Sequence, residues 1–346
     1  MRSMMFAAMC IALTGCNQPD TISFAAPHPD AVIEDIYVVT QQNVALDQDA
    51  FGSDRSTYLR RAQLSVSIPP THVLGQIAWP DGATDPLTDF AVVDFMPFPT
   101  SEAFARAMVD ADGDAIYLFV HGYNTTSSEA LYRFGQIAHD FNLPQTRLMF
   151  SWASAGVPGA YIYDRDSVLF ARDDLAQLLA DIARKTDKSI NLMAHSMGAM
   201  LSMEAMRQLA IAGDRDVLDR IDTVTFLSPD LDPDIFRAQA GTIGELPDPF
   251  IILTSQSDRA LNLASFLSGG RERIGGIGTA EDVVGLGVTY IDFTNLSDGR
   301  NLDHMVAVTS PAAITVLRRI IEEDAVRQSA FANFLILDRN GSLTAP

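Results

Sequence analysis

Cysteine is almost missing from this sequence. Among its 346 residues only Cys10 and Cys16 occur, and both lie near the N-terminus. The rest of the chain therefore can build neither a disulfide framework nor a site with a cysteine nucleophile.

Basic residues are also scarce. Lys and Arg number 24 against 44 Asp and Glu, which gives a formal net charge of −20 and a pI of about 4.5. Binding to nucleic acid and binding to anionic lipid both depend on clustered Lys and Arg. We therefore expect no nucleic-acid partner. Outside the N-terminus, no stretch of the sequence is long and apolar enough to span a bilayer.

The N-terminus differs from the rest of the chain. Arg2 gives it a basic start, residues 4–13 form an apolar run of signal-peptide length, and the run ends in Leu-Thr-Gly-Cys at Cys16. This ending resembles the bacterial lipobox, in which cleavage falls before a cysteine that becomes lipidated. We expect a signal peptide over residues 1–15, a lipid anchor on Cys16 and a tether over residues 16–30. The alternative is an ordinary secretory signal with a chance cysteine.

Such an anchor would hold the protein to a membrane of the bacterial cell envelope, facing the periplasm or exported. Residues 31–346 then form a single domain with its core at about 115–325. Strand-like and helix-like runs alternate along it, which indicates an α/β fold with a mostly parallel central sheet and helices on both faces. The expected strands are 36–40, 64–68, 115–120, 147–152, 189–194, 223–227, 250–254 and 288–293, the first two as an antiparallel edge. The expected helices are 129–141, capped by Ser127 or Ser128, and 166–184, 196–212 and 312–324.

The segment 191–198 joins a buried strand directly to a helix through Ser196. The nucleophile elbow of an α/β-hydrolase needs this arrangement, because a sharp turn lifts the serine above the sheet and small residues must flank it. The usual pattern is Gly-x-Ser-x-Gly, and Ala194 here replaces the first glycine. Ser196 is therefore the expected nucleophile. The alternative is a serine that only caps the helix.

A serine hydroxyl needs a base to take its proton, and the chain order in this fold is serine, acid, histidine. Of the six histidines, only His304 follows the serine, shortly after strand 288–293, where the loop after the last strand should deliver the base. His195 lies on the turn itself, and its ring would have to fold back to reach the hydroxyl. The others precede it, at positions 28, 72, 121 and 139.

Two aspartates are candidates for the acid that orients this histidine. Asp258 follows strand 250–254, the usual position, and Asp230 follows strand 223–227, where some relatives place it. Asp303 lies beside His304, and we interpret it as a solvated loop charge. We expect Asp258, with Asp230 as the alternative, and expect the unused one to cap a helix or support the site.

The oxyanion hole should combine the amide of Met197 with an amide from the loop after an earlier strand. Strand 115–120 runs into His121, Gly122 and Tyr123, and the glycine would let the backbone come close to a substrate oxygen. We expect the Tyr123 amide to be the second donor. The alternative is a plain turn capped by Asn124.

Several motifs in this order carry a family resemblance. From about residue 115 to 313 the chain resembles bacterial α/β-hydrolases catalogued as domain of unknown function nine hundred, within the esterase/lipase superfamily. The matching segments are 119–124, 150–152, 163–167, 195–198, 227–230 and 257–261. The resemblance implies a serine-hydrolase triad and an unknown natural substrate. By position it supports Ser196 and His304 and favours Asp258.

Segment 161–174 also matches a hallmark of that family. Tyr161 and Tyr163 are candidate substrate contacts, as is His121, although the charges at 164–166 indicate instead a salt-bridge network at a helix start. The Gly-rich segment 268–287 does not join a strand to a helix, so we interpret it as a mobile loop, with a lid as an open role.

These residues together predict a serine hydrolase that cleaves a small-molecule carboxylic ester through an acyl-enzyme, with no metal or cofactor required. Two alternatives stay open. One is an acyltransferase with the same triad, in which an alcohol or amine replaces water. The other is a non-catalytic envelope lipoprotein that retains the fold, since fold alone does not determine activity.

Overall fold

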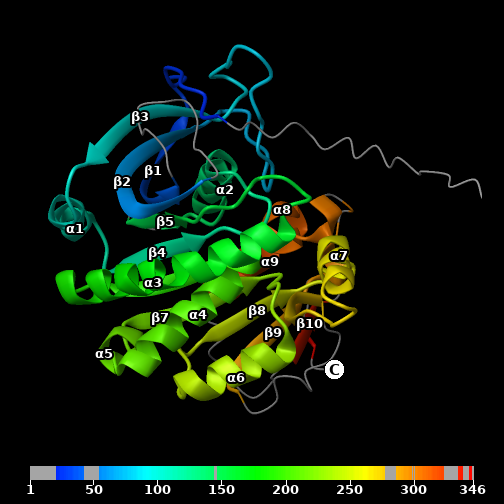
Figure 1. Cartoon of the computed structure of the whole chain (residues 1–346). Helices are drawn as coiled ribbons and strands as arrows, with labels where there is room; N and C mark the ends of the chain where they lie inside the picture. Colours follow the sequence, from blue (N-terminus) through cyan, green and yellow to red (C-terminus); the bar gives the residue numbers. More distant parts are fainter. Residues whose placement is uncertain are drawn as a thin grey trace, which may run out of the picture.

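A single mixed sheet runs through the centre of the protein (Figure 1). The computed structural model describes residues 21–42, 54–143, 146–276, 286–297, 299, 301–322, 334–337 and 343–344. Its strands are β1 (Val32–Gln42), β2 (Arg55–Ile68), β3 (Ala91–Phe98), β4 (Ala115–Val120), β5 (Arg147–Ser151), β6 (Ser189–His195), β7 (Ile221–Leu227), β8 (Phe250–Thr254), β9 (Val288–Asp292), β10 (Phe334–Leu337) and β11 (Leu343–Thr344). They lie in the order β11-β10-β9-β8-β7-β6-β4-β5-β1-β2-β3.

The middle of this sheet is parallel. Neighbouring strands from β1 and β5 through β4, β6, β7 and β8 to β9 and β10 all pair in the same direction. Strands buried on both faces are apolar along their whole length, which explains the continuous run Ala-Ile-Tyr-Leu-Phe-Val of β4. The carboxyl ends of β4, β6, β7 and β8 therefore meet at one edge.

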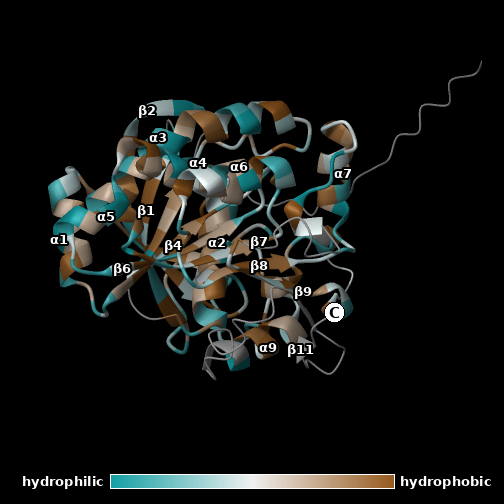
Figure 2. Ribbon diagram, turned by 90° about the horizontal axis from the view of Figure 1, so that it is seen from below, coloured by the Kyte–Doolittle hydropathy of each residue, from teal (hydrophilic) through white to brown (hydrophobic). Residues whose placement is uncertain are grey.

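Helices cover both faces of the sheet, and the core is divided accordingly. The helices are α1 (Ser101–Asp110), α2 (Ser127–Asp140), α3 (Tyr161–Lys185), α4 (Met197–Ala212), α5 (Arg215–Leu218), α6 (Pro233–Ile243), α7 (Arg259–Leu267), α8 (Val306–Thr309) and α9 (Pro311–Glu322). Buried residues of α1, α3, α4 and α6 pack in one cluster, and those of α2, α8 and α9 in the other. Figure 2 shows mostly brown, apolar strands lying between helices that carry both hydrophilic and apolar residues. The expected α/β-hydrolase architecture is confirmed.

Several element boundaries differ from the expectation for local reasons. Helix α2 is capped by Thr126, whose hydroxyl accepts the Glu129 amide at 3.1 Å, and not by Ser127 or Ser128. Those two serines lie inside the helix and are buried. Helix α3 begins at Tyr161, five residues before the expected start at 166. Its first turn buries Tyr161, so this turn belongs to the core.

The antiparallel edge is larger than expected. Strand β1 pairs antiparallel with β2, and β2 pairs antiparallel with β3, which the sequence did not predict. Strand β3 contains Pro97 and is exposed over much of its length. Proline is tolerated on an edge strand, because an edge strand has one side free of ladder hydrogen bonds.

The expected tether is only partly described. The proposed signal peptide and Cys16 lie outside the described residues, as do residues 17–20. For residues 22–25 the tether expectation is wrong, because Ile22 is buried, the Ser23 amide donates to the Tyr132 hydroxyl at 3.0 Å and the Ala25 amide donates to the Val92 carbonyl at 3.2 Å. No helix in the described part of the chain is long and apolar enough to cross a membrane.

The turn between β6 and α4 has an unusual backbone. Ser196 adopts φ 51° and ψ −120°, a conformation that costs a non-glycine residue energy. Neighbouring backbone groups hold it there. The Ser196 amide donates to the Leu227 carbonyl at 3.0 Å, and its carbonyl accepts the Asp230 amide at 3.2 Å and the Ala199 amide at 3.1 Å.

Two glycines let the end of β4 pack directly against this turn. A Cβ at Gly198 would lie 2.4 Å from the His121 carbonyl oxygen and 2.5 Å from that of Val120. A Cβ at Gly122 would lie 2.8 Å from the Ser196 Cβ. Real Cβ atoms do not approach this closely, so both positions require glycine for space.

We expect Gly198→Ala to destabilise the protein by about 1–3 kcal/mol or more, because the methyl group meets rigid backbone. Gly241→Ala is the matched control: Gly241 lies in α6 with nothing within 4 Å of its would-be Cβ. That change should stabilise the helix by roughly 0.5–1 kcal/mol. Urea unfolding measures both, and equal effects of the two substitutions would contradict the packing argument.

Candidate active site

Asp258 and His304 form a close pair at the carboxyl edge of the sheet. The His304 Nδ1 lies 2.6 Å from the Asp258 Oδ2. Asp258 also caps α7, because its Oδ1 accepts the Leu261 amide at 2.9 Å. Its side chain is fully buried and that of His304 is 16% exposed. The hydrogen bond to the Leu261 amide thus orients the Asp258 carboxylate, and the carboxylate in turn orients the His304 imidazole.

His304 is brought to this place by a tight turn. The two residues before it, Leu302 and Asp303, both have positive φ, at 57° and 59°. The ring of His304 packs on that of His195, the residue before Ser196, with centroids 4.6 Å apart. The expectation of a solvated Asp303 is wrong, since this residue is buried and its carboxylate accepts the Ser297 hydroxyl.

His195 is buried and faces this pair without a charge. Burial lowers the pKa of His195 well below its usual value, and the neighbouring His304 adds to the effect. A neutral ring next to His304 is compatible with His304 becoming charged during a reaction, whereas a second imidazolium would oppose it.

Asp230, the alternative acid, lies in a different cluster. Its Oδ1 is 3.1 Å from the Arg273 Nε, close but not aligned as a hydrogen bond, and its Oδ2 accepts the Tyr161 hydroxyl at 2.9 Å. Burial raises the pKa of Asp230, and the Arg273 charge opposes that rise. Burial likewise raises the pKa of Tyr161 to about 12. Asp230 therefore pairs with Arg273 through its side chain and supports Ser196 through its amide.

Arg273 belongs to the Gly-rich segment 268–287, and residues 273–275 of that segment are buried. Arg273 and Ile274 are buried, and a Cβ at Gly275 would lie 2.5 Å from the Ser228 carbonyl carbon. The expectation of a mobile loop is therefore wrong for residues 273–275, which are buried, while 269–272 are exposed and 277–285 lie outside the described residues. Arg273 could not be predicted as a partner of Asp230, because a glycine-rich run with two arginines does not indicate which carboxylate either one meets.

His121, the first residue after β4, is buried and packs within the protein. Its ring stacks on Trp152 with centroids 5.0 Å apart, and the Trp152 indole donates to the His121 carbonyl at 2.8 Å. Burial lowers the pKa of His121 to about 4, and its hydrogen bond to the Gly122 carbonyl only partly offsets this. The ring is therefore neutral near pH 7, and its Nδ1 contacts the Gly122 carbonyl.

His121 also lies near a second serine. The Ser151 hydroxyl is 3.3 Å from the His121 Nε2 and is shared with the Ser127 hydroxyl. Here no carboxylate backs the histidine, because its Nδ1 faces the Gly122 carbonyl at 3.0 Å. Ser151 also lies within β5 and has no strained turn. This pair is a buried polar network that joins β4, β5 and α2.

Two of the predicted substrate contacts, Tyr161 and Tyr163, lie apart, and Tyr161 meets the predicted oxyanion-hole residue Tyr123. Tyr123 and Tyr161 meet edge to face with centroids 5.3 Å apart, so both lie near Asp230. Tyr163 instead lies under the Arg55 guanidinium, 4.4 Å from the ring centroid. Two residues apart on a helix, Tyr161 and Tyr163 point in nearly opposite directions.

The start of α3 contains no ion pair among residues 164–166, contrary to the expected network. Asp164 is buried and accepts backbone amides from Asn124 at 3.0 Å and Ala155 at 2.8 Å. The Ser154 hydroxyl also donates to it at 2.7 Å. Asp164 thus ties the loop after β4 to the loop after β5.

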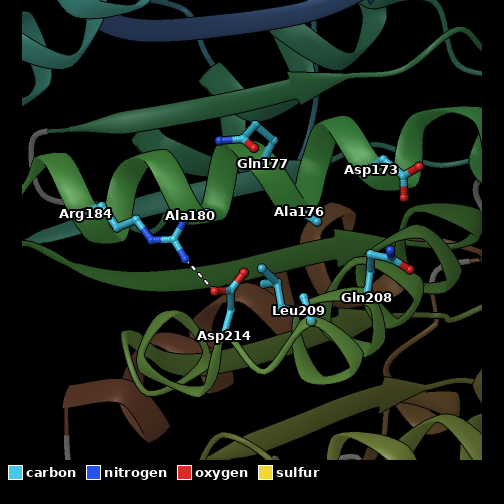
Figure 3. Close-up of a pocket in the computed structure, with 9 residues that line it drawn as sticks. Asp173, Ala176, Gln177, Ala180, Arg184, Gln208, Leu209 and Asp214 are labelled. Carbon is cyan, nitrogen blue, oxygen red and sulfur yellow. Dashed lines mark hydrogen bonds and ion pairs between the residues drawn. The ribbon is translucent and has the colours of Figure 1, made fainter.

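An open hollow of about 190 Å³ lies between α3 and α4, away from these residues (Figure 3). It is lined near the C-terminal ends of both helices, where Arg184 and Asp214 form an ion pair at 2.5 Å. The candidate site lies at their N-terminal ends, so the hollow has no part in it.

Comparisons with known proteins agree with this fold. Residues 97–322 match the family described as "Alpha/beta hydrolase of unknown function (DUF900)". A search of curated proteins finds no match. Among solved structures, lipase B of Aspergillus fumigatus is 13% identical (65% of this chain, 58% of that chain, TM-score 0.42). An esterase of Pyrobaculum calidifontis is 11% identical (85% and 86%, TM-score 0.38).

The chain thus spans less than two thirds of the lipase, and the likeness to both solved structures is distant. The family match is more informative, because it extends from the end of β3 through the strained serine turn to the end of α9. Since this match covers more than half of the chain, the protein belongs to the family of α/β-hydrolases of unknown function.

Proposed function

We propose that the protein is a serine hydrolase that cleaves carboxylic esters, with Ser196 as nucleophile, His304 as base and Asp258 as the orienting acid. The observation that carries the proposal is the 2.6 Å contact of His304 with a buried carboxylate, on a ring packed beside the serine turn. In this arrangement the Nδ1–H of His304 donates a hydrogen bond to the Asp258 carboxylate. The Nε2 of His304 is then the nitrogen that accepts the proton of the serine hydroxyl.

The reaction follows from these positions. His304 takes the proton of Ser196 as the serine oxygen attacks the ester carbonyl, and then gives it to the departing alcohol. Water, activated by the same ring, hydrolyses the acyl-enzyme and releases the acid. The amides of Met197 and Tyr123 would hold the oxyanion. The next amide in the loop, that of Asn124, is already taken by Asp164.

An uncharged, apolar acyl group fits the surroundings best. Tyr123 and Tyr161 lie side by side near Asp230, and their neighbours Val157 and Ile162 are exposed apolar residues. The buried pair of Arg273 with Asp230 beside them is internally neutral. We therefore propose a small-molecule ester or related acyl compound as substrate.

Ser196→Ala should lower kcat/KM for a short p-nitrophenyl ester by about 10³-fold or more, because the acyl-enzyme can no longer form. Ser151→Ala is the control, since it removes the other serine that lies beside a histidine. It should stay within a few fold of the unchanged protein. Circular dichroism checks the fold of both variants, and a fluorophosphonate probe should label all but Ser196→Ala. Full activity of Ser196→Ala would refute the assignment.

Asp258→Asn and Asp230→Asn separate the two candidate acids. Asparagine can still cap α7, so the first change should preserve the fold while lowering kcat by roughly 10²–10⁴-fold through loss of the orienting carboxylate. The second leaves Arg273 buried without its partner and should lower stability, with kcat reduced less than about tenfold. Ester kinetics and thermal unfolding measure the two effects. A larger loss of kcat in Asp230→Asn would reverse the choice of acid.

We also propose, from the N-terminal sequence, that the protein is a bacterial lipoprotein anchored through Cys16 and facing the periplasm. The lipobox-like run that ends at Cys16 supports this. The first described residue, Thr21, follows it closely, and Ile22 is already part of the domain core. An anchor on Cys16 would therefore hold the domain close to the membrane surface.

Cys16→Ser tests the anchor in cells. The unchanged chain should incorporate a clickable palmitate analogue and fractionate with membranes, whereas Cys16→Ser should do neither. Cys10→Ser is the control and should behave like the unchanged chain. Lipid labelling that survives in Cys16→Ser would show that the anchor is wrongly placed.

A further inference from the structure

A second cluster of chemically active side chains lies at the opposite end of α2 from the candidate active site. His72 is in the connection between β2 and β3, and His139 and Asp140 are in the last turn of α2. One nitrogen from each ring and one oxygen of the carboxylate lie within 4.8 Å of one another. The His72 Nε2 is 2.7 Å from the Asp140 Oδ1, and the two rings meet edge to face.

Outer partners hold two of these groups in fixed orientations. The second oxygen of Asp140 accepts the Gly75 amide at 2.7 Å and the Gln136 side-chain amide, which turns Oδ1 towards His72. The His139 Nδ1 is 3.2 Å from the Glu34 carboxylate, so Nε2 is the nitrogen available for a ligand. A carboxylate behind a histidine is the usual support for a metal ligand.

Glu34 is itself held in place. It forms a buried ion pair with Arg147 at 2.8 Å, and both side chains are only 8% exposed. Glu34 belongs to β1 and Arg147 to β5, so the support for His139 is built into the sheet. The orientation of this ring is therefore set by the fold and not by a flexible surface contact.

Protein contacts alone leave the cluster incompletely satisfied. The His72 side chain is 91% buried, and its Nδ1 has no hydrogen-bond partner among the described residues. A buried polar atom without a partner costs free energy. Asp140 is 1% exposed, whereas His139 is 30% exposed and opens the cluster to solvent. An ion could therefore enter from the side of His139.

We propose that His72, His139 and Asp140 form a binding site for a divalent transition metal of the zinc class, with solvent completing its coordination. Two imidazoles and one carboxylate suit Zn²⁺, whereas Ca²⁺ and Mg²⁺ prefer oxygen ligands. The 14 residues of α2 put the site about 20 Å from the turn that begins the helix near Tyr123. The metal thus takes no part in ester cleavage.

The metal would link segments that are far apart in the sequence. His72 lies in the β2–β3 connection, and the other two ligands lie on α2. Gln136, which orients Asp140, also donates to the Val308 carbonyl in α8 at 3.2 Å. Gly75 packs against the Thr309 carbonyl as well, where its would-be Cβ lies 2.2 Å away. One ion would therefore strengthen the junction of three segments far apart in the sequence.

Thermal unfolding and metal analysis of the untagged protein, stripped with a chelator, test the site. Added Zn²⁺ should bind at one ion per chain and raise Tm by several degrees, since a ligand that binds only the folded state stabilises it. Ca²⁺ at the same concentration should not. His139→Gln and His72→Gln should both lose the ion and the shift in Tm. His139 is the preferred variant because it is the most exposed of the three.

His28→Gln is the matched control, because His28 also lies beside a carboxylate, Asp30, but outside the cluster. It should keep both the stoichiometry and the Zn²⁺-dependent rise in Tm. Absence of that rise in the unchanged chain, or its persistence in His139→Gln, would show that the cluster is only a hydrogen-bonded contact. Ester hydrolysis by the metal-stripped protein is measured separately, so a failure to bind Zn²⁺ would not affect the proposed function.

Discussion

The backbone of Ser196 is the constraint around which the candidate site is organised. A residue at φ 51° and ψ −120° persists only when its surroundings hold it there. Here the Ser196 amide bonds to the end of β7, and its carbonyl receives the amide of Asp230. The end of β4 packs against the same turn through Gly122 and Gly198. Three neighbouring strands thus jointly fix one hydroxyl.

The two aspartates show how similar residues acquire different tasks from their surroundings. Asp258 caps a helix with one oxygen and faces His304 with the other, so one carboxylate serves both the fold and the site. Asp230 instead has one oxygen beside Arg273 and the other on the Tyr161 hydroxyl. The positions of the two aspartates after their strands favoured Asp258 as the acid. The contact of Asp230 with Arg273 could not be predicted, because the sequence around Arg273 does not indicate a partner.

Much of the fold could be predicted from the sequence, because buried parallel strands are continuously apolar. Strands β4 and β8 have the expected ends, and Ser196 lies at the expected strand-to-helix turn. Strand β3 was missed because its half-exposed pattern and Pro97 resemble a loop. Asp164 was misread as part of a salt-bridge network because its true partners, backbone amides of two loops, leave no trace in the sequence. His72 and His139 meet only through tertiary folding.

The strained turn also sets a limit on how stable this protein can become. Glycine adopts positive φ without penalty, so position 196 would favour it on conformational grounds alone. The serine at this position therefore costs conformational energy that a glycine would not, and it places a hydroxyl on the turn. Laboratory evolution towards heat resistance, run without selection for turnover, would be expected to remove that hydroxyl early. A residue that strains the backbone is thus the one on which the proposed chemistry depends.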